Sequence, residues 1–285
     1  MTGPRMRLLG RATPVEPVGE RGLVQIVGEG IEKTFTVDRT RHRAVASVDV
    51  TIGSGRSVGV IGESGSGKST LARMLAGLET ADGGGLHYNG IALSSHLRSR
   101  TGRHDFRRAV QMISQDVSSS FDPLRTLRDA VRTPAQILCG LDVPAADERV
   151  DEVLETLRVD PALADRRPHE VSGGQRQRFA IARALVVRPR VLLCDEVVSA
   201  LDVSVQGSVL NLLKDYVTET GAGLFFVSHG IPATAFLVDE LIVMQGGRIV
   251  ERGPTDDVVE RPEHEYTRFL VGAARGSARI GSVAS

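Results

Sequence analysis

A glycine-rich segment constrains this chain more than any other part of its sequence. Residues 62–69 have the sequence GESGSGKS, which matches the phosphate-binding pattern G-x-x-x-x-G-K-[ST]. A short apolar run, SVGVI at residues 57–61, precedes the segment, and a helical pattern follows at residues 69–78. A buried strand that leads through a glycine-rich loop into a helix is the context in which this pattern binds nucleotide phosphates. The segment therefore predicts an α/β fold and a nucleotide site.

The residue types of this segment suit phosphate binding. Glycines let successive backbone N–H groups turn toward one point, and the helix N-terminus adds partial positive charge there. Lys68 can reach the β- and γ-phosphates, the Ser69 hydroxyl can bind Mg²⁺, and Thr70 is expected near the α-phosphate. The predicted nucleotide-binding residues of this loop are Gly62, Glu63, Ser64, Gly65, Ser66, Gly67, Lys68, Ser69 and Thr70.

A second apolar run ends in two adjacent carboxylates. Residues 191–194, VLLC, are followed by Asp195 and Glu196. Because ligands bind at the carboxyl ends of strands in an open α/β sheet, these acids are expected beside the nucleotide. We expect Asp195 to hold Mg²⁺ and Glu196, which points to the opposite side of the strand, to have a different role. A carboxylate near the γ-phosphate can orient and deprotonate the attacking water, so Glu196 is the candidate catalytic base.

A second glycine-containing segment precedes another apolar helical pattern. Residues 171–175 have the sequence VSGGQ, in which Ser172 is a good N-cap and the glycines would expose N–H groups at a helix start. Two phosphate-binding segments for one nucleotide within one molecule would be redundant. A head-to-tail dimer removes the redundancy, because this segment of one subunit can face the γ-phosphate held by the other. The residues predicted to act across the dimer are Ser172, Gly173, Gly174 and Gln175.

Composition excludes several classes of protein. The 285 residues include 35 Lys and Arg and 35 Asp and Glu, so the formal net charge is zero and no global basic field attracts nucleic acid. The two cysteines, Cys139 and Cys194, cannot form a disulfide scaffold or a structural zinc site, and they suit a reducing cytoplasm. No apolar run reaches the roughly 18 residues of a membrane-spanning helix, so action at a membrane would require docking on another protein.

Apolar runs alternate with helical patterns along most of the chain. This alternation is typical of a mostly parallel sheet covered on both faces. A helical pattern at roughly 117–183 interrupts it and predicts a separate helical subdomain. We expect a flexible arm at residues 1–21, the main domain at 22–274 and a flexible tail at 275–285. The expected strands lie at 23–27, 44–52, 57–61, 86–88, 191–194 and 224–227, followed by a hairpin around Gly246 and Gly247.

Together these motifs resemble the ATP-binding subunits of ABC transporters, over residues 23–274. Residues 171–175 are similar to the family signature LSGGQ. The resemblance implies an α/β fold: a P-loop NTPase core with a mostly parallel sheet, an N-terminal antiparallel β-subdomain and an inserted helical subdomain. It implies that Gln115 of the Q-loop senses Mg²⁺ and the γ-phosphate, that His229 contacts the γ-phosphate and that Asp202 belongs to the D-loop. Phe35 is the best candidate for the aromatic that stacks on adenine, and a core position fits it nearly as well.

The resemblance completes the predicted site. The implied catalytic residues are Glu196, His229 and Gln115, and the implied Mg²⁺ ligands are Ser69, Gln115 and Asp195. The cofactors would be ATP and Mg²⁺. ATP sandwiched between two subunits would drive closure of the dimer, and hydrolysis would reset it.

Three further segments resemble the oligopeptide, dipeptide and nickel importer branch of the family. They are RPHE at 167–170, RIVERGPT at 248–255 and HEYTRFL at 264–270. The implied partners are a second ATPase subunit, identical or different, two transmembrane permease subunits and, indirectly, an extracytoplasmic solute-binding protein. Nucleic acid is not an expected partner. The chain would lie at the cytoplasmic face of the membrane as a peripheral subunit and drive import of peptides, nickel or a metal chelate.

The sequence departs from the family pattern at several positions. Val197 and Val198 stand where Pro-Thr usually follows the paired acids, and Gly230 stands where Asp usually follows the histidine. These departures leave open a subunit that binds ATP but hydrolyses it weakly within a heterodimer. A second alternative is a soluble ABC ATPase acting on nucleic acid or ribosomes. Such proteins usually have tandem cassettes, zinc modules or a long coiled coil, whereas this sequence has one cassette and no sustained heptads.

Overall fold

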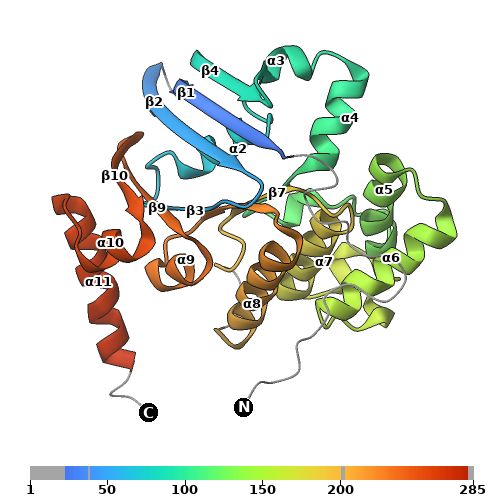
Figure 1. Cartoon of the computed structure of the whole chain (residues 1–285). Helices are drawn as coiled ribbons and strands as arrows, with labels where there is room; N and C mark the ends of the chain where they lie inside the picture. Colours follow the sequence, from blue (N-terminus) through green and yellow to red (C-terminus); the bar gives the residue numbers. More distant parts are fainter. Residues whose placement is uncertain (1–22, 38, 200–202, 282–285) are drawn as a thin grey trace.

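The computed structural model describes residues 23–37, 39–199 and 203–281. The predicted arm at residues 1–21 and the D-loop residue Asp202 lie outside the described residues, and both stay predictions. The described chain contains two sheets, with a group of helices on one side of them and the last helices on the other (Figure 1).

A six-stranded sheet lies at the centre of the fold. Neighbouring strands of this sheet pair in parallel from β9 to β6, and β10 pairs antiparallel to β9. The prediction of a mostly parallel sheet is therefore confirmed. The strand order is β10 (Arg248–Pro254), β9 (Glu240–Gln245), β3 (Ser57–Ile61), β8 (Gly223–Val227), β7 (Val191–Asp195) and β6 (Val110–Ile113).

Both faces of the central sheet are covered, which explains why its inner strands are continuously apolar. Every residue of β3, β7 and β8 is buried. Along β7, Leu192 and Cys194 join the hydrophobic cluster formed with helices α7, α8 and α9, whereas Leu193 joins the cluster that contains α2. These helices span Lys68–Leu75 (α2), Gly173–Leu185 (α7), Val203–Thr220 (α8) and Ile231–Leu237 (α9). Because β3, β7 and β8 are parallel, their carboxyl ends meet at one edge.

An antiparallel sheet covers α2 from the other side. Ile26 and Val45 of this sheet pack with Leu71 of α2 in one cluster. Its strands β1 and β2 are longer than the runs predicted at 23–27 and 44–52. The added residues 40–43 of β2 have exposed side chains, and register shifts between Gly28 and Thr34 interrupt the alternation along β1. The strand order is β2 (Thr40–Gly53), β1 (Gln25–Val37), β4 (Gly83–Tyr88) and β5 (Ile91–Ala92), followed by α3 (Leu93–His96) and α4 (Arg100–Ala109).

The helical subdomain lies beside the end of the central sheet that β6 forms (Figure 1). Helices α5 and α6 begin at side-chain caps, because the Thr126 hydroxyl accepts the Asp129 N–H at 3.1 Å and the Asp142 carboxylate accepts the Ala145 N–H at 3.0 Å. Residues such as Val131 form its core with α7. Its elements are η1 (Ser118–Ser120), α5 (Leu127–Cys139), α6 (Val143–Thr156), η2 (Pro161–Leu163), η3 (Pro168–Glu170) and α7.

The last two helices lie on the opposite side of the central sheet, next to β9 and β10 (Figure 1). They are α10 (Thr255–Glu260) and α11 (Glu265–Gly281). The predicted boundary at residue 274 falls inside α11, so residues 275–281 continue the helix instead of starting a tail. Among the described residues, no helix combines the length and the apolar character that crossing a membrane requires.

Candidate functional site

The glycine-rich loop joins the buried end of β3 to the start of α2. Gly67 is the N-cap residue of α2 and has a φ of 99°, a left-handed conformation that favours glycine. A Cβ atom on Gly67 would collide with the Ala44 carbonyl oxygen, and one on Gly62 would collide with the Met244 carbonyl oxygen. Glycine is therefore required at both positions because the loop passes close to the backbones of β2 and β9. The loop residues Glu63, Ser64 and Gly65 are exposed, and Thr70 is half-buried.

Lys68 is held by the loop that precedes it. Its Nζ lies 2.9 Å from the Gly62 carbonyl oxygen, 2.7 Å from that of Glu63 and 3.3 Å from the Ser66 hydroxyl. The side chain is buried, and burial lowers the pKa of Lys68 while the Glu196 and Asp195 carboxylates oppose that shift. The ammonium group is thus positioned inside the loop, where it can meet an anion.

The predicted carboxylate pair lies beside this loop, and its two members face different partners. The Ser69 hydroxyl donates to Asp195 Oδ1 at 2.8 Å, which joins the start of α2 to the end of β7. Burial raises the pKa of Asp195, and the negative charge of Glu196 adds to the shift, whereas the Ser69 hydrogen bond opposes it. Because burial disfavours the charged form of Asp195, a bound cation would stabilise its carboxylate.

Oxygen donors at this point fit Mg²⁺. The structure joins the Ser69 hydroxyl to the Asp195 carboxylate, whereas the Gln115 amide contacts the neighbouring Glu196. Hydroxyl, carboxylate and amide oxygens are hard ligands of the kind that Mg²⁺ takes, and the role of Gln115 as a third ligand stays a prediction. In the described residues, no group of three or more His, Cys, Asp and Glu side chains could hold a metal ion. A Mg²⁺ that takes further ligands from phosphate oxygens and water is compatible with such a sparse protein shell.

Two predicted residues, Gln115 after β6 and His229 after β8, meet the carboxylate of Glu196 at the end of β7. The Gln115 amide Nε2 donates to Glu196 Oε2 at 2.6 Å, and His229 Nε2 lies 2.5 Å from Glu196 Oε1. His229 Nδ1 lies 3.2 Å from the Gly62 carbonyl oxygen, so the cluster reaches the phosphate-binding loop. Glu196 has a φ of 51°, which is uncommon for a residue other than glycine and costs roughly 1–2 kcal/mol. The fold keeps this backbone strain at a residue that presents a carboxylate to the loop.

The VSGGQ segment begins α7 in the helical subdomain. The Ser172 hydroxyl accepts the Gln175 N–H at 3.2 Å, and the Gln175 side-chain oxygen accepts the Ser172 N–H at 2.8 Å, which is a reciprocal capping box. Ser172 and Gly173 are exposed, and a Cβ on Gly173 would find no atom within 4 Å. Among the hydrogen bonds of the described residues, none joins this segment to the loop at 62–69. The structure thus leaves the start of α7 facing solvent.

Phe35 lies in β1, and the two valines that depart from the family pattern lie in the core. Phe35 is half-buried in β1 opposite His42, and the Lys33 ammonium lies 5.4 Å from its ring centre. An adenine-stacking role for Phe35 stays a prediction. Val197 and Val198 are both buried in the cluster with α7 and α8. Their side chains therefore serve packing, and they leave Glu196 in contact with Gln115 and His229.

Tyr266 is a residue at this site to which the sequence assigned no role. Its hydroxyl oxygen accepts the backbone N–H of Glu63 at 2.7 Å, although the two residues are 203 positions apart. The segment HEYTRFL at 264–270 resembles the importer branch of the family, but the sequence did not indicate a contact with the loop at 62–69. That contact depends on the position of α11 in the tertiary structure.

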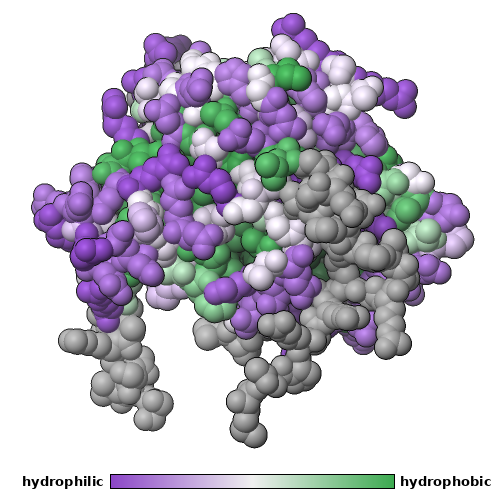
Figure 2. Space-filling model, viewed as in Figure 1, coloured by the Kyte–Doolittle hydropathy of each residue, from purple (hydrophilic) through white to green (hydrophobic). Residues whose placement is uncertain are grey.

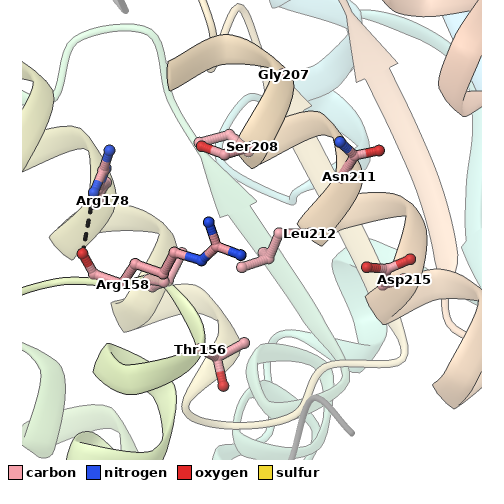
Figure 3. A pocket seen from close by; sticks show the side chains of 10 residues that line it. Thr156, Arg158, Arg178, Gly207, Ser208, Asn211, Leu212 and Asp215 are labelled. Atoms are coloured by element: carbon pink, nitrogen blue, oxygen red, sulfur yellow. Dashed lines mark hydrogen bonds between the residues drawn. The ribbon is translucent and has the colours of Figure 1, made fainter. Parts of the chain in front are cut away.

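A separate cavity of about 540 Å³, lined by both polar and apolar side chains, lies between the end of α6, α7 and α8 (Figure 3). The guanidinium of Arg158 points into it, and the Arg178 guanidinium donates to the Arg158 carbonyl oxygen at 3.2 Å. Asp215 and Asn211 of α8 lie across from them. None of the predicted nucleotide-binding residues lines this cavity, so it is distinct from the loop at 62–69.

Comparison with known proteins gives a consistent set of relatives. The family model described as ABC transporter matches residues 45–199. The oligopeptide transport ATP-binding protein OppF of Lactococcus lactis subsp. lactis (strain IL1403) is 38% identical over 231 residues, which cover 81% of this chain and 72% of that protein. OppF of Bacillus subtilis (strain 168) is 38% identical over 250 residues, covering 85% and 80%. The glutathione import ATP-binding protein GsiA of Escherichia coli (strain K12) is 40% identical over 237 residues, covering 83% of this chain and 38% of that longer protein.

Solved structures share the architecture described above. The dimeric structure of MJ0796, described as a bacterial ABC transporter cassette, superposes with a TM-score of 0.75 at 26% identity and covers 81% of this chain and 98% of that one. A dimeric post-hydrolysis state of the same cassette, bound to ADP and Pi, has a TM-score of 0.74 at 25% identity, with the same coverage of both chains.

Proposed function

This chain is an ATPase cassette of the ABC transporter family, and on that basis we propose that it is the ATP-hydrolysing subunit of an importer for peptides or a related small solute. The observation that carries this proposal is the convergence of Gln115 and His229 on the carboxylate of Glu196, beside the phosphate-binding loop. Residues from three strand ends thereby face the position where a γ-phosphate would lie. The names of the relatives, which include oligopeptide and glutathione import proteins, support the transport role.

The loop at 62–69 would bind the triphosphate of ATP. Its backbone N–H groups at the N-terminus of α2 would donate hydrogen bonds to the phosphate oxygens. Lys68 Nζ, which is held at the loop carbonyls, would contact the β- and γ-phosphates. Ser69, Asp195 and Gln115 would hold Mg²⁺, which neutralises charge on the phosphate oxygens when bound.

Glu196 would act as the general base. Its carboxylate would accept a proton from water as the water oxygen attacks the γ-phosphorus and the bond to the bridging oxygen of ADP breaks. His229 would hold the γ-phosphate, and Gln115 would orient the water. Both side chains contact the Glu196 carboxylate in the structure, which places them within reach of the atoms on which Glu196 would act.

We infer that ATP is sandwiched between two cassettes. Ser172 and Gly173 are exposed at the start of α7, and the reciprocal capping box orders this segment without using any group of the loop at 62–69. Backbone N–H groups at the start of a helix can donate hydrogen bonds to a phosphate that a partner subunit holds. The similar cassette MJ0796 forms dimers, which supports the same arrangement for this chain.

The permease subunits and the position at the cytoplasmic face of the membrane are further parts of the proposal. The surface of the face in Figure 2 is mostly hydrophilic, with hydrophobic side chains scattered across it. In the segment that follows Gln115, Leu124 and Ile137 are 79% and 64% exposed. Exposed apolar side chains on the helical subdomain are compatible with contact to a membrane subunit.

ATP turnover and dimer formation test the proposal. Glu196→Gln is expected to keep ATP binding, to accumulate as an ATP-bound dimer and to lose at least about a hundred-fold in phosphate release, the scale of a missing general base. Glu152→Gln is the matched control, because Glu152 pairs with Arg188 in the helical region at 3.3 Å and should leave turnover unchanged. Wild-type turnover in Glu196→Gln would refute the assigned base. A wild-type chain that binds no ATP, or that stays monomeric with ATP and its natural partners present, would refute the proposed function.

A further inference from the structure

One peptide group at the start of the phosphate-binding loop is bound at both of its ends. The carbonyl oxygen of Gly62 accepts from Lys68 Nζ at 2.9 Å and lies 3.2 Å from His229 Nδ1. The N–H of the same peptide group belongs to Glu63 and donates to the Tyr266 hydroxyl oxygen at 2.7 Å. A peptide group is planar and rigid, so a contact that fixes its N–H also fixes the direction of its carbonyl.

Tyr266 is itself held in place by contacts outside the loop. It lies in the first turn of α11, and its backbone N–H donates to His264 Nδ1 at 3.2 Å. The Glu251 carboxylate in β10 accepts the N–H groups of Glu263 and His264 at 2.8 and 2.9 Å, which ties the start of α11 to the central sheet. Although burial opposes it, the hydrogen bonds to this carboxylate lower the pKa of Glu251, so the tie is ionised near neutral pH. The aromatic ring of Tyr266 also packs against the core formed with α9.

We propose that Tyr266 is a positioning residue for ATP binding, which acts through the Gly62–Glu63 peptide group on Lys68 and His229. This inference rests on the proposed function of the loop at 62–69. The two side chains that contact the Gly62 carbonyl, Lys68 and His229, must turn toward the phosphates when ATP enters. The hydroxyl of Tyr266 binds the Glu63 N–H and is not expected to contact the phosphates, so it would hold the peptide group in one orientation while Lys68 and His229 move.

The alternative orientation explains why such a contact matters. If the Gly62–Glu63 peptide group rotated, its carbonyl oxygen would leave Lys68 Nζ and His229 Nδ1, and these side chains would lose the acceptor that positions them. Each such rotated molecule would be less competent to bind ATP, and apparent affinity falls with the fraction of competent molecules. Since the Glu63 N–H lies in an exposed segment, water can replace the hydroxyl, and the expected loss is a few-fold and not complete.

The test uses the full chain and compares Tyr266→Phe with Tyr216→Phe. The phenylalanine ring in the first variant would keep the packing of the tyrosine ring and remove the hydroxyl alone. The control also removes one tyrosine hydroxyl from a hydrogen bond to a backbone group, since Tyr216 Oη donates to the Pro189 carbonyl at 2.8 Å. The measurements are the dissociation constants for ATP and ADP by calorimetry, the Tm of each variant and, for the assembled ATPase, the KM for ATP against kcat.

Tyr266→Phe is expected to weaken the binding of ATP and ADP by about two- to ten-fold, the loss of one hydrogen bond, and to raise KM more than it lowers kcat. Tyr216→Phe is expected to lower Tm without changing either dissociation constant. If both variants lower Tm and neither changes nucleotide affinity, Tyr266 is structural and the inference is overturned. If the wild-type chain itself binds no ATP, the proposed function fails first, and that outcome is distinct from the failure of the Tyr266 inference.

Discussion

Replacing Gly230 by aspartate, which the family usually has at this position, should change the stability of the fold in a way that unfolding experiments can measure. Gly230 is the N-cap residue of α9 and has an extended backbone with φ −91° and ψ 106°, which any residue can adopt. No side chain caps this helix end. A Cβ atom at Gly230 would lie 3.6 Å from the Ser228 hydroxyl oxygen and 3.9 Å from Ala233 Cβ, which are ordinary contacts. The site therefore has room for an aspartate.

The expected gain in stability has two parts. Replacing glycine at a compatible backbone conformation lowers the entropy of the unfolded chain and contributes about 0.4–1 kcal/mol. An aspartate at the N-cap can accept the N–H of Ala233, because Pro232 has none, and exceeds glycine there by a few tenths of a kcal/mol. Gly230→Asp should therefore raise the free energy of unfolding by about 1 kcal/mol, equivalent to a rise of roughly 2–4 °C in Tm.

Urea and thermal unfolding of the nucleotide-free chain measure this change. Gly230→Ala separates the two parts, because alanine gains the same entropy but is a poor N-cap residue, so its effect should be close to zero. Gly230→Asn tests the contribution of charge, since asparagine caps a helix without a negative charge. If Gly230→Asp is no more stable than Gly230→Ala, the capping argument is wrong. If it is less stable than wild type, the space inferred around Gly230 is wrong as well.

Three further predictions concern the loop, the carboxylate and the exposed helix start. Ser172→Ala should lower the free energy of unfolding by about 1 kcal/mol, because it removes the N-cap of α7, and should prevent ATP-dependent dimerisation measured by light scattering. The control Thr126→Ala removes the N-cap of α5, so it should lose the same stability and still form dimers. Gly67→Ala should abolish ATP binding in calorimetry, because of the left-handed backbone and the collision with Ala44; retained affinity would contradict the described loop geometry. Burial raises the pKa of Asp195 in the folded chain. The contribution of this side chain to stability is therefore largest at a pH below the usual pKa of aspartate, and it is lost as pH rises through the raised pKa. Without nucleotide, Asp195→Asn should therefore gain stability relative to wild type as pH rises from about 4 to about 8 in urea titrations, and a pH-independent difference would refute this reasoning.

Local patterns in the sequence predicted the elements that form through interactions between residues close together in the chain. The buried strand at 57–61, the loop after it and the helix at Lys68–Leu75 follow from apolar residues, required glycines and a helix start, all of which are neighbours in the chain. Strand β6 was not predicted, because VQMI has no alternation and a basic helix precedes it. The rest of β1 and β2 was missed because register shifts interrupt the alternation along β1, and because residues 40–43 of β2 pair through the backbone with exposed side chains.

The sequence by itself determined which residue types are available and how nearby backbone is shaped. Lys68 follows a loop whose glycines set its path, and Ser172 and Gln175 cap their own helix, so these groups depend on contacts within a few residues. The tertiary structure alone decided that Glu196 meets Gln115 and His229, and that Tyr266 binds the N–H of Glu63 across 203 positions. Such contacts depend on strand order in the central sheet, and strand order is set by the packing of whole elements, which no short segment of sequence encodes.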